Sequence, residues 1–387
     1  MANPRNVLSW LRGREAELTR LLGQLVRVES SSYDREGVNE LVEMLAREWK
    51  RRGARVERLR PARAGRERGD LLRCEIAGGG DGARAGQILV LGHTDTVYER
   101  GTLARTPFRV VRGRASGPGT LDMKAGLVIA LGAVDALRTA RLASRRRVVF
   151  LWTPDEEIGS EAARPMIERE ARRSSAVLVL EPGTGLTGRL KTARKGVGEF
   201  RIDVRGRAAH AGVNPQDGVN AVHELALQIA RIARFAEPRR GITVNPDVVS
   251  GGTRTNVVAE HAHALVDVRC TRAADMRRVT ARFRGLRPIL PGAKVHVSGG
   301  MDRPPMERRV AARLFSRAQA LGRELGFELE ESFTGGGSDG NFTAALGVPT
   351  LDGLGAVGAG AHTPGEFIFT RSLPERAALL AALLADL

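Results

Sequence analysis

Residues 87–97, QILVLGHTDTV, contain the pattern that decides the fold. The first six residues form an apolar run, which is typical of a strand buried on both faces of a parallel sheet. An imidazole and a carboxylate, His93 and Asp95, follow this run directly. Open α/β sheets bind their ligands beyond the carboxyl ends of the strands. The stretch therefore predicts both a fold class and the position of a site.

Two further apolar runs, RVVFLW at 147–152 and AVLVL at 176–180, predict buried strands of the same kind. Segments with apolar residues at helical spacing alternate with these strands. Such alternation predicts the α/β class, with a mainly parallel sheet and helices on both faces. The remaining elements expected in this part of the chain are strands at 54–59, 71–76 and 349–352 and helices at 39–52, 124–136, 311–326 and 371–387.

The middle of the chain has a different pattern, in which strands alternate between apolar and polar residues as half-exposed strands do. Its elements follow the order β-α-β-β-α-β, which is the ferredoxin-like arrangement. They are a strand at 198–206, a helix at 217–235, strands at 242–249 and 263–269, a helix at 273–286 and a strand at 293–298. We therefore expect an inserted domain at 195–300 and a discontinuous first domain formed by residues 1–194 and 301–387.

The length and composition are those of an ordinary globular protein with two or three domains. Of 387 residues, 42% are hydrophobic and 27% are charged, and no apolar run reaches the roughly 20 residues of a membrane-spanning helix. Residues 1–20 carry several charges and no apolar segment, unlike a secretory signal. The two cysteines, Cys74 and Cys270, form no CxxC pair, which excludes a disulfide framework and a thiolate zinc cluster. We expect a cytoplasmic protein with no membrane partner.

The chain is strongly basic, with 61 Lys and Arg residues against 44 Asp and Glu residues. Only five of these cations are lysines, so the surplus is mainly arginine. One interpretation is nucleic-acid binding, and the other is arginine spread over the whole surface. The basic runs are short and scattered, and aromatic residues make up only 4%, too few for base-stacking platforms. We therefore expect no nucleic-acid partner, whereas an acidic substrate would gain from the electrostatic field.

Acidic and imidazole side chains follow the predicted parallel strands, at the edge where such sheets place their sites. Each of them alone has an ordinary structural explanation, such as a helix cap or a buried loop histidine. Together they indicate a metal site built from oxygen and nitrogen ligands. The residues are His93 and Asp95 after 87–92, Asp122 in a Gly-rich turn, Asp155, Glu156 and Glu157 after 147–152, Glu181 after 176–180, and His362 in the segment GAHTP.

Five ligands are too many for one catalytic zinc ion, but they suit two zinc ions that share a bridging carboxylate. The adjacent Glu156 and Glu157 do not both reach one ion easily. We expect one of them to bind metal, and the other to hold the attacking water and accept its proton. Asp95 lies two residues after His93, where its carboxylate would accept the second imidazole N–H and select the tautomer.

Seven segments resemble the zinc aminoacylase and carboxypeptidase family, which includes acetylornithine deacetylase, succinyl-diaminopimelate desuccinylase and glutamate carboxypeptidase. The stretch from His93 to Gly119 is most similar to the glutamate carboxypeptidase branch. The resemblance implies that Asp122 bridges the two ions and that Glu156 is the general base. The segments are LGHTDTV, ASGPGTLDMKAG, TPDEEIGS, LEPG, GRAAHAG, GGGSDG and GAHTPGE. The metal ligands that it implies are His93, Asp122, Glu157, Glu181 and His362.

The resemblance also implies roles for the inserted domain, which would act as a lid and form a homodimer. His210, in the segment GRAAHAG, would stabilise the developing oxyanion, in its own or the partner subunit's site. Asn256 and Arg269 match substrate-binding positions of the family. The backbone N–H groups of Gly336, Gly337 and Ser338 would line the substrate pocket.

The leading hypothesis is a hydrolase with two zinc ions per subunit that cleaves an amide bond next to a free carboxylate, similar to glutamate carboxypeptidase. Its substrate would be a small peptide or an N-acyl amino acid, and cobalt or manganese could replace zinc. The first alternative is a deacylase of N-acyl amino acids, which the motifs do not separate from a carboxypeptidase. A more distant alternative is a non-catalytic binding homologue, although such a protein would be expected to lose the base or a ligand.

Overall fold

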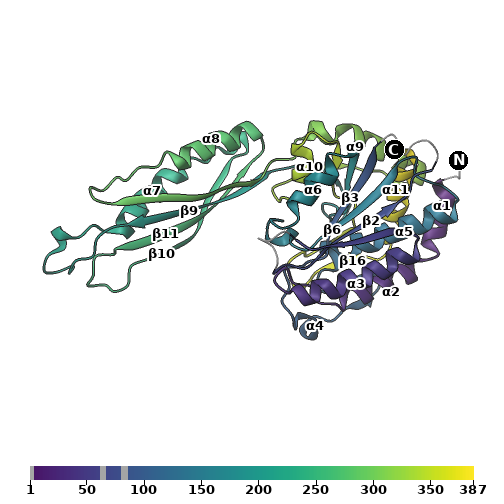
Figure 1. Cartoon of the computed structure of the whole chain (residues 1–387), viewed down its shortest axis with the longest axis horizontal. Coiled ribbons are helices and arrows are strands. Elements are labelled where there is room, and N and C mark those ends of the chain that lie inside the picture. Colours follow the sequence, from purple (N-terminus) through teal and green to yellow (C-terminus); the bar gives the residue numbers. More distant parts are fainter. Residues whose placement is uncertain (1–3, 62–66, 80–85) are drawn as a thin grey trace. The chain divides into compact units, whose positions relative to one another are not determined.

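The computed structural model describes residues 4–61, 67–79 and 86–387. In the first part of the chain, strands alternate with helices as expected (Figure 1). No helix within the described ranges is both long enough and apolar enough to span a membrane.

The chain divides into two compact units, which are each described separately below. The first unit is formed by the residues up to Ala193, by Arg308–Phe333 and by Ser338–Leu387. The second unit is formed by Arg194–Glu307 and Thr334–Gly337. It extends beyond residue 300 because the strand β12 (Lys294–Arg303) pairs with β9 (Gly196–Arg205) as far as Arg303.

A six-stranded sheet forms the centre of the first unit, in the order β1-β2-β6-β3-β7-β14. The strands are β1 (Arg55–Leu59), β2 (Leu71–Ile76), β3 (Gln87–His93), β6 (Arg147–Thr153), β7 (Ser174–Val179) and β14 (Thr350–Leu351). β6, β3, β7 and β14 pair in parallel, whereas β2 is antiparallel to both of its neighbours. The α/β class with a mainly parallel sheet is confirmed, and in this sheet β2 alone runs in the opposite direction.

Helices cover both faces of this sheet, because alternate strand residues point to opposite sides. The helices of the first unit are α1 (Pro4–Arg12), α2 (Glu15–Val26), α3 (Arg35–Arg51), α4 (Thr102–Arg105), α5 (Ala125–Thr139), α6 (Arg164–Ala171), α9 (Arg308–Leu325), α10 (Gly340–Ala345) and α11 (Ser372–Asp386). On one face, Leu89 and Val149 are buried in a cluster that includes Phe342 of α10. On the other face, the ring of Trp49 in α3 lies 4.3 Å from that of Phe150, centroid to centroid.

Several parts of the first unit are not predicted by the sequence pattern, including the helices α4, α6 and α10. The helices α1 and α2 precede the expected elements, and a small sheet in the order β15-β16-β5-β4 joins two distant segments. Its strands have two or three residues each, too few to show a periodicity. They are β4 (Arg109–Val111), β5 (Arg114–Ser116), β15 (Gly358–Ala359) and β16 (Phe367–Phe369). A further pair is formed by β8 (Leu190–Arg194) and β13 (Glu331–Thr334).

The second unit is an antiparallel sheet in the order β10-β11-β9-β12 with two helices, which confirms the ferredoxin-like arrangement. Its other elements are α7 (Ala221–Ala233), β10 (Thr243–Gly251), β11 (His261–Cys270) and α8 (Ala273–Arg284). The core includes the stacked rings of Phe200 and Phe283, whose centroids are 4.1 Å apart. α7 begins later than expected because the Asn220 side chain caps it, accepting the N–H groups of Val222 and His223.

Candidate metal centre

Three neighbouring strands of the first unit deliver most of the ligand candidates. β3 lies between β6 and β7, and the three strands are parallel. His93 is the last residue of β3, Glu156 and Glu157 follow the end of β6, and Glu181 follows the end of β7. Because the carboxyl ends of parallel strands meet at one edge, these side chains converge there.

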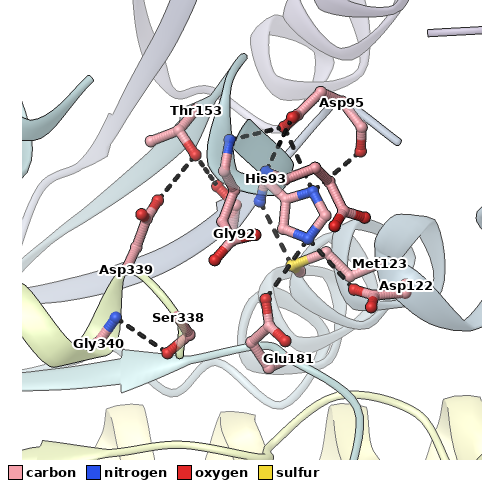
Figure 2. A network of polar contacts seen from close by, with 12 residues as sticks. Gly92, His93, Asp95, Asp122, Met123, Thr153, Glu181, Ser338, Asp339 and Gly340 are labelled. Carbon is pink, nitrogen blue, oxygen red and sulfur yellow. Dashed lines mark hydrogen bonds and ion pairs between the residues drawn. The ribbon is translucent and has the colours of Figure 1, made fainter. Parts of the chain in front are cut away.

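Asp122 lies between two imidazole rings. Its Oδ1 is 3.2 Å from Nε2 of His93, and its Oδ2 is 3.3 Å from Nε2 of His362. Each ring also meets a second carboxylate. Nε2 of His93 is 3.4 Å from Oε1 of Glu181, and Nε2 of His362 is 3.2 Å from Oε2 of Glu157. The five predicted ligands therefore form two groups that share Asp122, and Figure 2 shows the group around His93.

Asp95 orients the residues around it, although with a different atom from the one expected. Nδ1 of His93 is 2.9 Å from the main-chain oxygen of Asp95 and 3.4 Å from its Oδ1, so the main-chain oxygen is the nearer acceptor. Either acceptor places a ring proton on Nδ1, so Nε2, which faces Asp122, is the nitrogen that would bind a metal ion. The Asp95 carboxylate accepts the N–H groups of Glu156 and Glu157 at 3.2 and 3.1 Å, which fixes the main chain of both glutamates.

Charge in the cluster is compensated by the two imidazole rings. Burial disfavours the charged form of Asp122, but hydrogen bonds from His362 and His93 hold its pKa well below the usual range. Hydrogen bonds to Asp122 and Glu157 raise the pKa of His362 to about 10. Burial opposes a charge on His93, yet its carboxylate partners raise the pKa of that ring as well. The ring of His362 is therefore positively charged at neutral pH when no metal is bound, and the carboxylates around His93 favour the charged form of that ring.

The donor atoms fit divalent metal ions. Oε1 of Glu157 is buried and has no hydrogen-bond partner, which is costly unless a positive group meets it. Ligand atoms of His93, Asp122 and Glu157 lie within 4.8 Å of one another, as do those of His93, Glu156 and Glu181. Carboxylate oxygen and imidazole nitrogen are the ligands of catalytic zinc sites. The orphaned oxygen and the donor set together make this cluster a candidate metal centre.

Residues 89–386 match the model of peptidase family M20/M25/M40. The chain belongs to this family. It is 31% identical over 371 residues to carboxypeptidase G2 of Pseudomonas sp. strain RS-16, covering 95% of this chain and 88% of that protein. It is 28% identical over 318 residues to succinyl-diaminopimelate desuccinylase of Paraburkholderia xenovorans strain LB400, covering 75% of this chain and 80% of that protein. The solved structure of aminopeptidase PepT from Bacillus cereus has a TM-score of 0.77 at 24% identity, covering 96% of this chain and 98% of that chain.

The family assignment confirms the resemblance that the sequence motifs predicted. This M20 peptidase is a hydrolase of the metallopeptidase and amidohydrolase group, and its cluster of acidic and imidazole residues is the metal-binding candidate of the described chain.

Three predicted residues of the M20 peptidase lie in its second unit, at two ends of one sheet. His210 forms an isolated antiparallel β-bridge with Val257, and the main-chain oxygen of Asn256 accepts the N–H of Ala211 at 3.0 Å. His210 and Asn256 are therefore close together. Arg269 lies at the far end of β11. At roughly 3.4 Å per residue, His261 and Arg269 of this strand are about 27 Å apart. The structure therefore brings His210 and Asn256 together, but not Arg269.

The side chains of His210 and Arg269 each have defined partners. Nδ1 of His210 accepts the N–H groups of Gly212 and Val213, both at 3.1 Å, so the neutral ring carries its proton on Nε2. The Arg269 guanidinium donates to the Asp267 carboxylate through Nε and Nη2, and to the main-chain oxygen of Gly335 through Nη1. A substrate carboxylate would therefore have to compete with Asp267.

In the segment GGGSDG, not every backbone N–H group that was predicted to line the substrate pocket is free to do so. Ser338 is fully buried, its N–H donates to Oδ1 of Asn341, and its hydroxyl donates to Asp352. The main-chain oxygens of Gly336 and Gly337 accept from Nη1 of Arg194 at 3.1 and 2.9 Å. Ser338 thus holds the segment in place in this structure, and substrate binding by these three residues stays a prediction.

Two residues that hold the site together were assigned no role from the sequence. Ser32 is buried and donates its hydroxyl to Oδ2 of Asp95 at 2.7 Å. It lies in a run of three serines, which carries no signal for such a contact. Glu366 is buried and accepts the N–H of Asp122 at 3.0 Å. Its position four residues after His362, within the segment GAHTPGE, was the available signal.

The raised imidazole pKa values predict that metal binding releases protons. Near neutral pH the ring of His362, with a pKa of about 10, carries a proton that a metal ion must displace. Raising the pH makes that proton easier to remove, so we expect the affinity for Zn²⁺ to increase as the pH rises through neutrality. Titration calorimetry in buffers of different ionisation enthalpy measures the number of protons released per ion.

Two histidine variants provide the comparison. His362→Ala should weaken binding and release fewer protons, whereas His296→Ala should change neither, because His296 is exposed and lies outside the cluster. Binding without proton release in the wild type would contradict the assignment of the rings as ligands.

Proposed function

We propose that this M20 peptidase is a hydrolase with two zinc ions per subunit that removes a residue bearing a free carboxylate, in the manner of a glutamate carboxypeptidase. The observation that carries the proposal is the position of Asp122, whose two oxygens face separate groups of ligands. One carboxylate between two such groups suits a pair of metal ions. The substrate class follows the relative named carboxypeptidase G2, at 31% identity.

The proposed ligands are His93 and Glu181 in one group, His362 and Glu157 in the other, and Asp122 in both. When bound, two divalent cations supply Lewis acidity toward the carbonyl oxygen and the attacking water. Zinc fits these nitrogen and oxygen donors, and cobalt or manganese would accept the same set.

Glu156 is the proposed general base. Its N–H donates to Asp95, and its carboxylate lies within 4.8 Å of ligand atoms of His93 and Glu181. It is therefore held at the metal cluster, while Glu157 faces His362. In this position the Glu156 carboxylate would take the proton of the attacking water and return it to the leaving amine nitrogen.

His210 is the proposed oxyanion donor. Because its Nδ1 already accepts two backbone N–H groups, its Nε2–H is left as a donor for a developing negative charge. We propose that it acts in the partner subunit's site, with Asn256 beside it. This role requires a homodimer.

The proposed homodimer uses the β10 edge of the second unit. β10 is the last strand of its sheet, so one row of its backbone groups has no strand partner within the sheet. Val248 and Val249 on this strand are 47% and 56% exposed. Val222 of α7, also exposed, lies against Gly251 at the end of the strand. An apolar exposed edge of this kind favours pairing with a second copy.

The alternative function is deacylation of an N-acyl amino acid. It is favoured by the 28% identity to a succinyl-diaminopimelate desuccinylase, and the metal ligands and Glu156 would serve both reactions. A non-catalytic homologue is disfavoured because the proposed base and all five ligands are present. A screen of dipeptides and N-acyl amino acids, read by released amine, separates the two hydrolytic functions.

A cytoplasmic location and the lack of membrane and nucleic-acid partners stay predictions from composition. The two cysteines, Cys74 and Cys270, are buried free thiols, which fits a reducing compartment.

Glu156→Gln tests the general base. The amide keeps the size of the side chain but cannot accept a proton, so we expect kcat to fall by about 10²–10⁴-fold. Metal content, measured by elemental analysis, should not change. Glu161→Gln is the control, because Glu161 is exposed and outside the cluster. Ordinary turnover by the Glu156 variant would rule out the assignment.

Arg269→Ala tests the carboxylate clamp. A guanidinium binds a carboxylate through two parallel hydrogen bonds, and losing one charged hydrogen bond costs about 1.5–3 kcal/mol. We expect KM to rise about 10- to 100-fold with unchanged metal content, and Arg269→Lys to recover part of the loss.

The matched control is Arg201→Ala, since Arg201 pairs with Asp203 on the same sheet as Arg269 pairs with Asp267. A substrate with an amidated carboxyl group should be poor for the wild type and no worse for the Arg269 variant. Equal hydrolysis of free-acid and amidated substrates by the wild type would refute the clamp.

Val249→Lys tests the homodimer. A lysine on the β10 edge places a charge where the second copy would pair, so we expect the dimer of the wild type to become a monomer in sedimentation velocity. Val111→Lys is the control, because Val111 is equally exposed on β4, the edge strand of another sheet. A wild type that sediments as a monomer at micromolar concentration would remove the role of His210 in the partner's site.

A further inference from the structure

Glu366 lies against the turn that carries Asp122. It immediately precedes β16, whose first residue, Phe367, pairs with Ser116 of β5. β5 leads directly into the Gly-rich turn, and the main-chain oxygen of Glu366 accepts the N–H of Gly117 at 3.3 Å. The side chain of Glu366 is 1% exposed. The small sheet therefore buries an acidic side chain beside the bridging carboxylate.

Four donors converge on the Glu366 carboxylate. Oε1 accepts the N–H groups of Leu121 and Asp122 at 2.6 and 3.0 Å. Oε2 accepts the N–H of Gly119 at 3.1 Å and the hydroxyl of Tyr98 at 2.6 Å. An ionised carboxylate offers about four lone-pair positions and no hydrogen. All four are used, and a neutral amide of the same size would turn an N–H toward some of these donors.

The same side chain belongs to the loop that carries His362. The N–H of Glu366 donates to the main-chain oxygen of Thr363 at 3.1 Å, and the Tyr98 hydroxyl lies 2.9 Å from that oxygen. His362 has a φ of +64°, a left-handed conformation that is uncommon for a residue with a side chain. The Glu366 carboxylate thus ties the main chain of the His362 loop to the main chain of Asp122.

The other half of the cluster has a separate support. His93 ends β3 and Glu181 follows β7, so the central sheet places both of them. The side chain of His362 is 50% exposed, whereas that of His93 is 1% exposed. Asp122 belongs to both groups, but only the His362 group also depends on the loop that Glu366 holds. Loss of the Glu366 contacts should therefore weaken the group with His362 more than the group with His93.

We propose that Glu366 is a positioning residue for the metal position formed by Asp122, Glu157 and His362. The inference rests on the proposed function, because it requires two metal positions. Glu366 is not one of the proposed metal ligands, and it acts by holding two ligand-bearing segments at a fixed separation. Partners of this kind typically contribute 10–100-fold to metal affinity.

The test is a titration of the metal-free protein with Co²⁺, followed by visible absorption and by metal analysis. The wild type should bind two ions per chain. In Glu366→Gln the affinity for the first ion should change much less than the affinity for the second, which we expect to fall about 10- to 100-fold. Tyr98→Phe should weaken the second ion in the same direction but less, because the three backbone donors keep the carboxylate in place.

Glu29→Gln is the matched control. Glu29 also accepts two backbone N–H groups, those of Gly101 and Leu103, each at 2.7 Å, but it does not contact the turn of Asp122. It should bind both ions as the wild type does. Thermal unfolding reports whether each variant folds. If Glu366→Gln does not fold, the affinity of Tyr98→Phe for the second ion tests the role of Glu366 instead.

The outcomes separate the two proposals. Two ions bound with wild-type affinity by Glu366→Gln, equal weakening of both ions, or the same loss in Glu29→Gln would overturn the role of Glu366 and leave the two-metal function standing. A wild type that binds fewer than two ions would overturn the proposed function and this inference together.

Discussion

The site depends on holding several buried carboxylates at one edge of a sheet. Such groups repel one another and lose hydration, so they stay charged only if positive charge lies among them. Asp122 meets this constraint by placing one oxygen on each of two imidazole rings. The protonated rings balance part of the charge in the metal-free protein, and divalent ions would replace those protons when they bind. Protonation of the imidazole rings and binding of metal ions are therefore coupled, because both supply positive charge to the same carboxylates.

The architecture of the first unit supplies this cluster with a fixed frame. Both faces of the central sheet are packed with apolar residues, which hold the strands β3, β6 and β7 in register, and acidic and imidazole side chains lie at their carboxyl ends. The small sheet has the complementary role, because it pairs β16 with β5 and so brings the His362 loop to the Asp122 turn. A site drawn from residues 93 to 362 thus rests on two sheets, a large one that places three ligand segments and a small one that joins the other two.

The sequence pattern was sufficient to predict those elements that are long enough to show a run or a periodicity of apolar residues. Buried strands are continuous apolar runs, and the candidate ligands His93, Glu157 and Glu181 lie at or shortly after their ends, so these strands and these candidates were both predictable. The strands β4, β5, β15 and β16 were not, since elements of two or three residues show no periodicity. For the same reason the contact of Glu366 with Asp122, which depends on the pairing of β5 and β16, could not be foreseen. The main-chain acceptor of His93 and the burial of Ser338 likewise follow from tertiary packing.

The second unit adds a geometric argument about the proposed active site. His261 and Arg269, near the two ends of β11, are about 27 Å apart, and His210 lies at the His261 end, where it forms a β-bridge with Val257. An extended dipeptide spans only about 7 Å. Long side chains shorten the gap but do not close it, so His210 and Arg269 of one chain cannot both contact one small substrate. If both residues act on the same amide bond, they must come from different copies of the chain. The separation therefore links the proposed oxyanion role of His210 to the proposed dimer more directly than the exposed valines do, because it follows from the length of a single strand.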